Sequence, residues 1–180
     1  GACSISSVGE VTIVGAGACD IHIGQPGNAT YADSGVQHIS FNVAKAQQAS
    51  LTESSITSTP YGDNVYLHAL GGSGTGSVSY EARGTCTINQ NLMIPGDAGT
   101  LCEVRAVQDA DNDYEVAYSP WVTIEITRAF QQTLLISSSG TVTYGSTISL
   151  TTVGGTGPNP TTFVTTGTCS VSGSTLTPGD

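Results

Sequence analysis

The sequence predicts an all-β protein built from tandem β-sandwich repeats with a period of 83 in residue number. Composition is the first of three observations that predict this fold. Charged residues make up 10% of the chain, against roughly 25% in an ordinary globular domain, and Gly, Ser and Thr take their place. Because these residues weaken helix interiors, the composition favours short strands joined by tight turns. The other two observations are an alternation of apolar and polar residues and an internal repeat.

Apolar and polar residues alternate with a period of two, which marks strands with one buried face. The apolar positions of the two clearest segments are Val65, Leu67, Ala69, Val122, Ile124 and Ile126. The Gly-rich segment 71–76 and the segment 95–99, which begins Pro-Gly-Asp, are predicted turns between such strands. About six or seven strands per repeat is the spacing expected of a β-sandwich.

The repeat has a constant offset and needs no gaps. The tripeptide Gly-Thr-Cys at 84–86 recurs at 167–169 and, as Gly-Ala-Cys, at 1–3. The tripeptide Pro-Gly-Asp at 95–97 recurs at 178–180. Unrelated segments do not share one fixed offset through so many Gly, Cys and Pro positions, so the chain is an array of related units. Two residues separated by this offset occupy the same repeat position.

The repeat divides the chain into three segments. Residues 47–129 form a complete repeat, residues 1–46 the C-terminal part of another repeat, and residues 130–180 the N-terminal part of a third. The third segment matches the complete repeat at 16 of 51 positions and the first at 7 of 46. Because a half sandwich exposes an apolar face and strand edges, we expect neighbouring repeats or identical subunits to complete the terminal segments.

The five cysteines follow the same pattern. The spacing from Cys3 to Cys19 equals that from Cys86 to Cys102, and each pair flanks a predicted hairpin turn. We therefore expect two cross-strand disulfides, each worth roughly 3 kcal/mol through loop-closure entropy. The partner of Cys169 at this spacing would be position 185, outside the 180-residue segment. A zinc site is the alternative, but zinc usually needs four ligands at short spacings.

The repeated motifs resemble those of bacterial immunoglobulin-like repeats. They are Tyr-Gly at 61–62 and 144–145, Gly-Gly-x-Gly at 71–74 and 154–157, Gly-Thr-Cys at 84–86 and 167–169, Pro-Gly-Asp at 95–97 and 178–180, and a basic residue followed by Ala at 45–46 and 128–129. Such tandem repeats occur in very large secreted or cell-surface proteins of the adhesin or fibre type. The resemblance implies an immunoglobulin-like sandwich that serves as a spacer, stalk or fibre module.

We expect the chain to be an extracellular structural or adhesive array at the cell surface. One alternative is an adhesin module whose loops, such as 71–76 or 109–113, bind a glycan or a host protein. Another is an accessory domain of a secreted hydrolase or a phage tail protein. The sequence has no Gly-x-Ser-x-Gly elbow and no His in a catalytic context, so we expect neither enzymatic activity nor a cofactor.

Three carboxylates give the sharpest candidate site. Asp109, Asp111 and Asp113 alternate in one loop, and such side chains can converge on Ca²⁺, which takes six to eight oxygen ligands. The loop lacks the Gly and the distal Glu of an EF-hand, and a solvated turn is the alternative. Asn28 begins an Asn-Ala-Thr triplet, a glycosylation acceptor pattern that also occurs by chance.

Tyr31 and Tyr114 occupy one repeat position after this loop. The repetition favours a structural role, in which the ring packs on the core and the hydroxyl bonds to backbone, over a ligand-stacking role.

The net charge is −10, with only four basic side chains. This charge argues against nucleic acid and anionic membrane surfaces as partners, since both need clustered Lys and Arg. No run of about 18 apolar residues is present, so we expect no membrane insertion.

Overall fold

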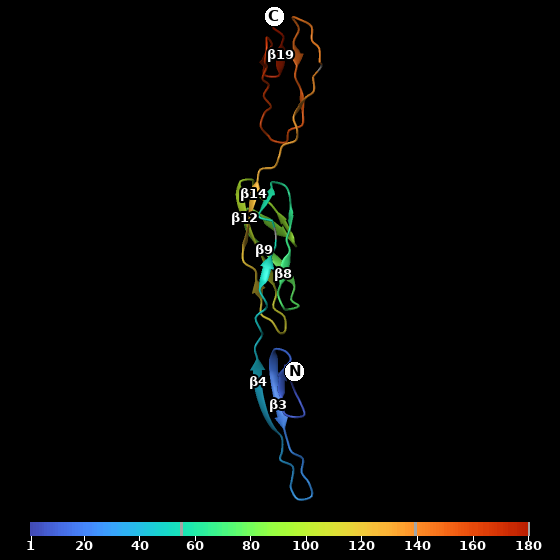
Figure 1. Ribbon diagram of the computed structural model, residues 1–180, viewed down its shortest axis with the longest axis vertical. Coiled ribbons are helices and arrows are strands. Elements are labelled where there is room, and N and C mark those ends of the chain that lie inside the picture. The colour runs from blue at the N-terminus through green and yellow to red at the C-terminus, as the bar shows by residue number, and fades with distance from the viewer. Residues whose placement is uncertain (55, 139, 180) are drawn as a thin grey trace. The chain divides into compact units, whose positions relative to one another are not determined.

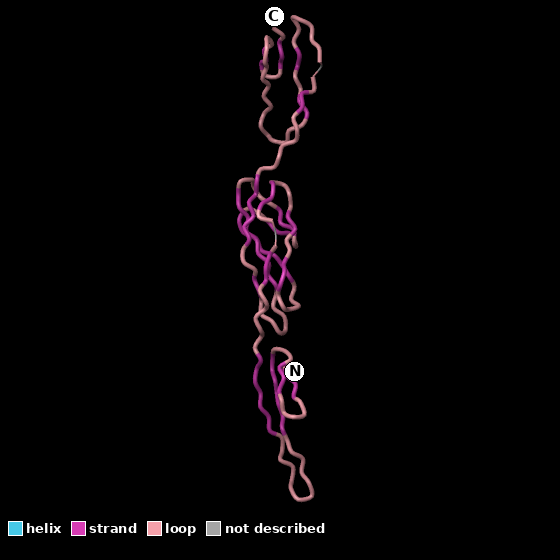
Figure 2. Tube along the Cα trace, in the orientation of Figure 1, coloured by secondary structure: helices cyan, strands magenta, loops and turns pink. Residues whose placement is uncertain are grey.

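The computed structural model describes residues 1–54, 56–138 and 140–179. Every regular element in this part of the chain is a β-strand, as the sequence predicts (Figure 2). No helix able to cross a membrane occurs among these residues. The chain divides into two compact units, Gly1–Arg128 and Ala129–Asp180.

Strand β12 (Thr100–Gln108) is the centre of the largest sheet, which lies in the first unit (Figure 1). Along one edge β12 pairs antiparallel with β9 (Val78–Gly84), and along the other with β14 (Val122–Thr127) and β13 (Ala117–Tyr118). Strand β14 also pairs with β6 (Ser58–Pro60), and that pair is parallel. The sheet thus places an early and a late strand of the complete repeat side by side.

Two smaller sheets supply the other side of the core. One contains β10 (Thr87–Asn89), β11 (Leu92–Ile94) and β7 (Val65–Tyr66), and the other contains β5 (Leu51–Glu53) and β8 (Ala69–Gly71). Side chains in or next to β7, β10 and β11 meet side chains of the large sheet in one cluster of buried residues, namely Val65, Leu67, Cys86, Met93, Cys102, Val104, Ile124 and Ile126. This arrangement is that of a β-sandwich, in which the inner faces of two layers form the core.

The predicted alternation matches the observed burial. Leu67 is fully buried and its neighbours Tyr66 and His68 are exposed. Ile124 and Ile126 are fully buried, and Glu125 between them is exposed. The two alternating segments lie in different layers of the sandwich, so each contributes its apolar face to the same core.

The first 46 residues of unit one form two hairpins. Strand β1 (Cys3–Ile5) pairs with β2 (Val11–Ile13), and β3 (Gly17–Ile23) pairs with β4 (Gln37–Val43), both antiparallel. These two sheets have two strands each. Much of their apolar surface is exposed, since Phe41 is 40% exposed and Ile23 is 71% exposed.

Among the residues described in the second unit, five short segments form strands. They are β15 (Leu135–Ile136), β16 (Ile148–Ser149), β17 (Thr152–Val153), β18 (Ser170–Ser172) and β19 (Thr175–Thr177). Strand β15 pairs with β17, and β19 pairs with both β16 and β18. None of the residues described in this unit is fully buried.

Strand pairs in different segments are related by the repeat offset. Ile88 pairs with Met93, and Val171, at the repeat position of Ile88, pairs with Leu176. The pairs of β5 with β8 and of β12 with β14 likewise correspond to those of β15 with β17 and of β3 with β4. The hairpin of β1 and β2 departs by one residue from this register, because Ile5, at the repeat position of Ile88, pairs with Val11 and not with Glu10, at the position of Met93.

One repeat position requires glycine because of its backbone conformation and a close backbone contact. Gly71 and Gly154 both have positive φ, 94° and 90°. A Cβ at Gly71 would collide with the carbonyl oxygen of Ser50, and a Cβ at Gly154 with that of Thr133. Ser50 and Thr133 also share one repeat position, so the same close backbone approach occurs in both units.

The burial of Leu67 predicts how much a cavity in the core lowers the stability of the fold. Leu67→Ala should lower the free energy of unfolding by about 2–5 kcal/mol, because Leu67 is fully buried. The matched control is Leu70→Ala, since Leu70 is 60% exposed, and its effect should stay within about 0.5 kcal/mol. Urea denaturation measures both values, and equal effects would contradict this assignment of the core.

Candidate functional site

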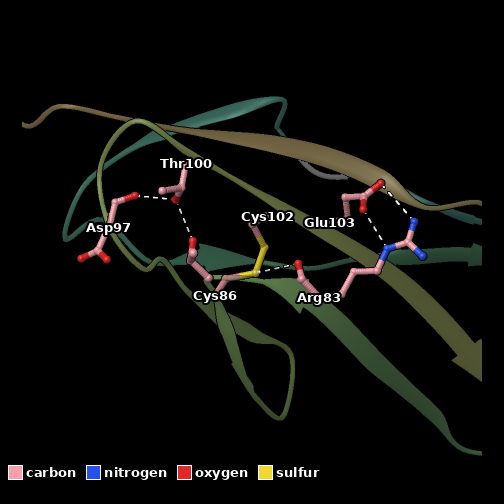
Figure 3. Close-up of a disulfide and its surroundings, with 7 residues drawn as sticks. Arg83, Cys86, Asp97, Thr100, Cys102 and Glu103 are labelled. Atoms are coloured by element: carbon pink, nitrogen blue, oxygen red, sulfur yellow. Dashed lines mark hydrogen bonds and ion pairs between the residues drawn. A yellow bond between two sulfur atoms is a disulfide. The ribbon is translucent and has the colours of Figure 1, made fainter.

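The structure contains two disulfides, Cys3–Cys19 and Cys86–Cys102, each with a sequence separation of 16. Figure 3 shows the bond between Cys86 and Cys102. Cys102 lies in β12 and is fully buried. Cys86 lies between β9 and β10, so the bond connects the large sheet to the smaller sheet of β10. The bond therefore joins two layers of the sandwich, and its two cysteines flank the hairpin of β10 and β11, as the sequence predicts.

Cys169 has a free thiol and is half-buried. It shares the repeat position of Cys86 and lies next to β18, as Cys86 lies next to β10. Its sulfur contacts the carbonyl oxygen of Thr166 at 3.5 Å, and the sulfur of Cys86 contacts that of Arg83 at 3.8 Å. The free cysteine thus has local surroundings similar to those of a bonded one.

Two ion pairs lie on the outer face of β9 and β12. Arg83 is opposite Glu103, and its Nε donates to Oε2 of Glu103 at 2.7 Å (Figure 3). Arg105 is opposite Glu81, and its Nε donates to Oε2 of Glu81 at 2.7 Å. The hydrogen bond between Arg83 and Glu103 raises the pKa of the guanidinium and lowers that of the carboxyl.

Trp121 stacks against both arginines. The guanidinium carbon of Arg83 is 4.2 Å from the ring centroid of Trp121, and that of Arg105 is 4.7 Å away. Arg105 also lies 4.5 Å from the ring centroid of Tyr118. Sequence analysis missed this cluster, although the Glu and Arg residues that alternate along two neighbouring strands were a signal for it. Cation–π contacts favour a fixed position for these long side chains.

The corresponding place in the first segment also holds a stacked pair. His22 and His38 are opposite each other on β3 and β4, with ring centroids 5.7 Å apart. They share the repeat positions of Arg105 and Trp121. The pair of His22 and His38 and the pair of Arg105 and Trp121 thus make a cross-strand ring contact at the same repeat positions in two segments. The recurrence of the contact with different residue types favours a structural role for both pairs.

The three aspartates of the acidic loop have separate partners. Asp109 accepts a hydrogen bond from the hydroxyl of Ser77, at 2.5 Å, and Asp111 Oδ2 accepts from the backbone N–H of Thr75, also at 2.5 Å. Asp113 Oδ1 accepts from the backbone N–H of Ala16, at 2.7 Å. Among the residues described, no group of three or more His, Cys, Asp or Glu side chains is arranged to hold a metal ion. This geometry does not favour calcium, which stays an untested prediction.

The side chain of Asp111 organises the loop by accepting hydrogen bonds from backbone N–H groups. Its Oδ1 accepts from the N–H groups of Asp113 and Tyr114, at 2.9 and 2.8 Å. Asn28, at the same repeat position, accepts in the same way from Thr30 and Tyr31, at 2.8 and 2.9 Å. Asn28, the predicted glycosylation acceptor, thus forms the same turn as Asp111.

Backbone donors shift the titration of Asp111. Hydrogen bonds from the N–H groups of Thr75, Asp113 and Tyr114 lower its pKa to about 2. A carboxylate that accepts several backbone bonds is stabilised in its charged form. The acidic loop is therefore held to the Gly-rich turn by an acceptor that stays ionised at neutral pH.

The acidic loop also contacts the preceding segment. Besides the bond from Ala16 to Asp113, the backbone of Ala46 pairs with that of Tyr114 and its N–H donates to the carbonyl of Asp113 at 2.8 Å. Gln48 donates through Nε2 to the carbonyl of Glu115, at 2.8 Å, and accepts through Oε1 from backbone N–H groups of the Gly-rich turn. The linker and both loops thus share one hydrogen-bond network.

The two repeated tyrosines differ from each other in exposure. Tyr31 is 73% exposed, so its predicted packing on a core is wrong for the first segment as it stands. Tyr114 is half-buried, and its backbone forms the bridge to Ala46. Tyr31 lies in the loop between β3 and β4, outside the paired strands.

Comparison with family models, with curated proteins and with solved structures found no match.

The disulfides predict a thiol count and a loss of stability. Denatured, unreduced chain should show one thiol, and reduced chain five. The double variant Cys86→Ala/Cys102→Ala should lose about 3 kcal/mol of unfolding free energy, because the open loop gains entropy in the unfolded chain. Cys169→Ala is the control and should change little. Five thiols before reduction would contradict the pairing.

The lowered pKa of Asp111 predicts that the stability of the fold depends on pH. Its lowered pKa means that it stabilises the fold above its unfolded pKa of about 4, and that this contribution is lost as the pH falls toward 2. Asp111→Ala should therefore lower the melting temperature at pH 7, and the difference from the parent chain should shrink between about pH 4 and pH 2.

Asp111→Asn is the matched control, since Asn28 makes the same turn. This variant should keep more of the stability than Asp111→Ala at pH 7. A melting difference between parent and Asp111→Ala that is the same at pH 7 and pH 2 would contradict the role of the ionised carboxylate.

Proposed function

We propose that the chain is part of an extracellular structural array, in which immunoglobulin-like sandwiches follow one another at the repeat period as a stalk, spacer or fibre at the cell surface. The observation that carries this proposal is the path of the chain through the complete repeat. It enters and leaves at opposite ends of β12, as modules joined end to end require.

The two ends are marked by hydrogen bonds. On entering, Ala46 pairs with Tyr114 and Gln48 bonds to the carbonyl of Asp109, beyond the Gln108 end of β12. On leaving, Ile126 in β14 pairs with Thr100, at the other end of β12. Nine residues of strand separate these ends, which is roughly 30 Å at about 3.3 Å per residue. Each repeat would therefore add length to the array.

The strand order supports an immunoglobulin-like assignment. The large sheet has β9, β12, β14 and β6 as successive neighbours, and β10, β11 and β7 form part of the opposing layer. A disulfide between the layers and a core of alternating inward residues are features of such sandwiches. The strand registers that recur at the repeat offset support a tandem repeat of this unit.

The parallel pair of β6 and β14 suits a module under tension. The N–H of Glu125 donates to the carbonyl of Thr57, and the N–H of Tyr61 donates to the carbonyl of Thr127, both at 2.9 Å. Because β6 is near the start of the repeat and β14 near its end, pulling on the two chain ends slides these strands past each other. Such shear loads their hydrogen bonds together.

The chemistry of the chain fits an extracellular setting. Two disulfides are typical of an oxidising environment outside the cytosol. Acidic side chains, which give a net charge of −10, favour solubility and weak self-association of the modules.

The alternative of a binding module relies on loops 71–76 and 109–113. In the structure these loops bond to each other through Asp111 and Thr75, and to the linker through Gln48. Their polar groups are therefore engaged in holding segments of the chain together, which favours the structural proposal over recognition of a glycan or a host protein by these loops.

Force spectroscopy on the full chain, held at both ends, tests the proposal. Tyr61→Pro removes the N–H that bonds Thr127 and should lower the unfolding force, with a loss of about 1 kcal/mol at equilibrium. The substitution fits the backbone, since Tyr61 precedes Gly62 of φ 89° in a turn closed by Asp63 and Pro60, where Pro is favoured.

Tyr61→Ala is the matched control, because it changes the same side chain and keeps the N–H. It should unfold at the force of the parent chain. Equal forces for Tyr61→Pro and Tyr61→Ala would contradict the mechanical role of this strand pair. Antibody to the chain should label intact source cells, and labelling only after permeabilisation would contradict the surface location.

A further inference from the structure

The hairpin of β3 and β4, whose strands lie side by side in Figure 1, carries two histidines on its outer face. His22 in β3 is the partner of His38 in β4, and the two ring centroids are 5.7 Å apart with an angle of 32° between the ring planes. Both side chains are exposed. Cys19, which is buried, lies an odd number of residues from His22 on β3 and therefore faces the other way.

This outer face stays at the surface where both edges of the corresponding strand are paired. In the complete repeat β12 is hydrogen-bonded along both edges. Arg105 and Trp121, at the repeat positions of His22 and His38, are half-buried there, and Thr123 beside them is exposed. The accessibility of the histidine pair therefore comes from the face of the sheet on which it lies, whatever strand pairs with the other edge of β3.

The spacing of the two rings fits one metal ion held between them. An imidazole nitrogen binds zinc at about 2.0–2.1 Å, so two imidazoles on one ion have ring centres roughly 5–6 Å apart. The ring centroids of His22 and His38 are already 5.7 Å apart. Rotation about the side-chain bonds can turn one nitrogen of each ring toward the ion, with the backbone pairing of β3 and β4 unchanged.

The charge around the pair favours a cation. Asp20 comes two residues before His22 on β3, so its carboxylate lies on the same face. It accepts a hydrogen bond from the hydroxyl of Ser40, its partner on β4. Neither strand contains Lys or Arg. The carboxylate is therefore fixed next to the histidines, where its negative charge offsets part of the charge of a bound ion.

We propose that His22 and His38 bind a divalent transition-metal ion of the class of Zn²⁺, Ni²⁺ and Cu²⁺. Imidazole is a preferred ligand of these metals, whereas Ca²⁺ and Mg²⁺ take oxygen ligands. Among the described residues no group of three or more His, Cys, Asp or Glu side chains is arranged to hold a metal ion. The two imidazoles are therefore the protein ligands, and water fills the remaining positions of an ion that exchanges readily.

The complete repeat does not share this site. Its residues at the two positions are Arg105 and Trp121, and neither a guanidinium nor an indole N–H offers a lone pair to a metal. The cross-strand ring contact is structural in both segments and sets the distance between the side chains. The residue type then decides that only the pair of His22 and His38 can act as metal ligands.

A bound ion would connect the two strands at the base of a loop. His22 and His38 flank residues 24–36, the loop between β3 and β4 that contains Asn28 and Tyr31. A metal link that closes a loop lowers the conformational entropy of the unfolded chain and so stabilises the hairpin. The site goes beyond the proposed array and does not depend on it.

Calorimetric titration of the disulfide-bonded chain with Ni²⁺ or Zn²⁺ tests the site. Cys169→Ala serves as the parent of the series, because the free thiol of Cys169 would itself bind these metals. This parent should bind one ion per chain. His22→Ala and His38→Ala, each made in the same parent, should both weaken binding by about 10²-fold, since one imidazole alone gives no chelate. Circular dichroism shows whether each variant keeps its fold.

His68→Ala is the matched control in the same parent. His68 is also exposed, but it lies between β7 and β8 in the other layer of the sandwich. The variant should bind the metal as the parent does. Parent affinity in His22→Ala or His38→Ala, or a loss of binding in His68→Ala, would overturn the assignment.

NMR gives a second measurement that leaves all three histidines in place. Zn²⁺ should shift the imidazole C–H signals of His22 and His38 at the same metal concentration and leave those of His68 unchanged. Signals of His22 and His38 that respond at different concentrations, or no shift at millimolar Zn²⁺, would contradict a shared ion. Neither result touches the force difference between the Tyr61 variants, so this proposal and that of the array fail separately.

Discussion

The pairing of β12 with three other strands is the constraint on which the complete repeat depends. Both edges of β12 are hydrogen-bonded over most of its length, and its inward side chains Cys102, Val104 and Ala106 are fully buried. The same strand carries the disulfide to the opposite layer and residues of both ion pairs of the outer face. Removing β9 or β14 from it would expose these buried side chains to solvent.

Polar groups in this protein act mainly as internal connectors. Asp111, Asp113 and Gln48 each bond to backbone groups of a different segment, and together they hold the Gly-rich turn, the acidic loop and the linker in one network. A chain with few charges has few long side chains to connect its segments, so short acceptors and backbone N–H groups connect them instead. The arrangement explains why a loop rich in Asp need not be a metal site.

Much of the fold was predictable because its signals are local. The alternation around Leu67 and Ile124 identified buried faces, and the spacing of Cys86 and Cys102 identified the disulfide partners. Sequence analysis missed the parallel pair of β6 and β14 and the stack of Trp121 on two arginines. Both join residues from separate strands, and a parallel pair leaves no turn between its members that a sequence pattern could mark.

The sequence by itself determined the class of secondary structure, the constant repeat offset and the cysteine pairs, because strand alternation, turn residues and cysteine spacing are written along the chain. Only the tertiary structure decided which layer each strand joins, that the disulfide connects two sheets, and that the carboxylates of Asp109, Asp111 and Asp113 turn toward three different partners. The physical reason is that hydrogen bonds and burial are satisfied between segments distant in sequence, and the alternation that makes a strand does not specify its neighbour.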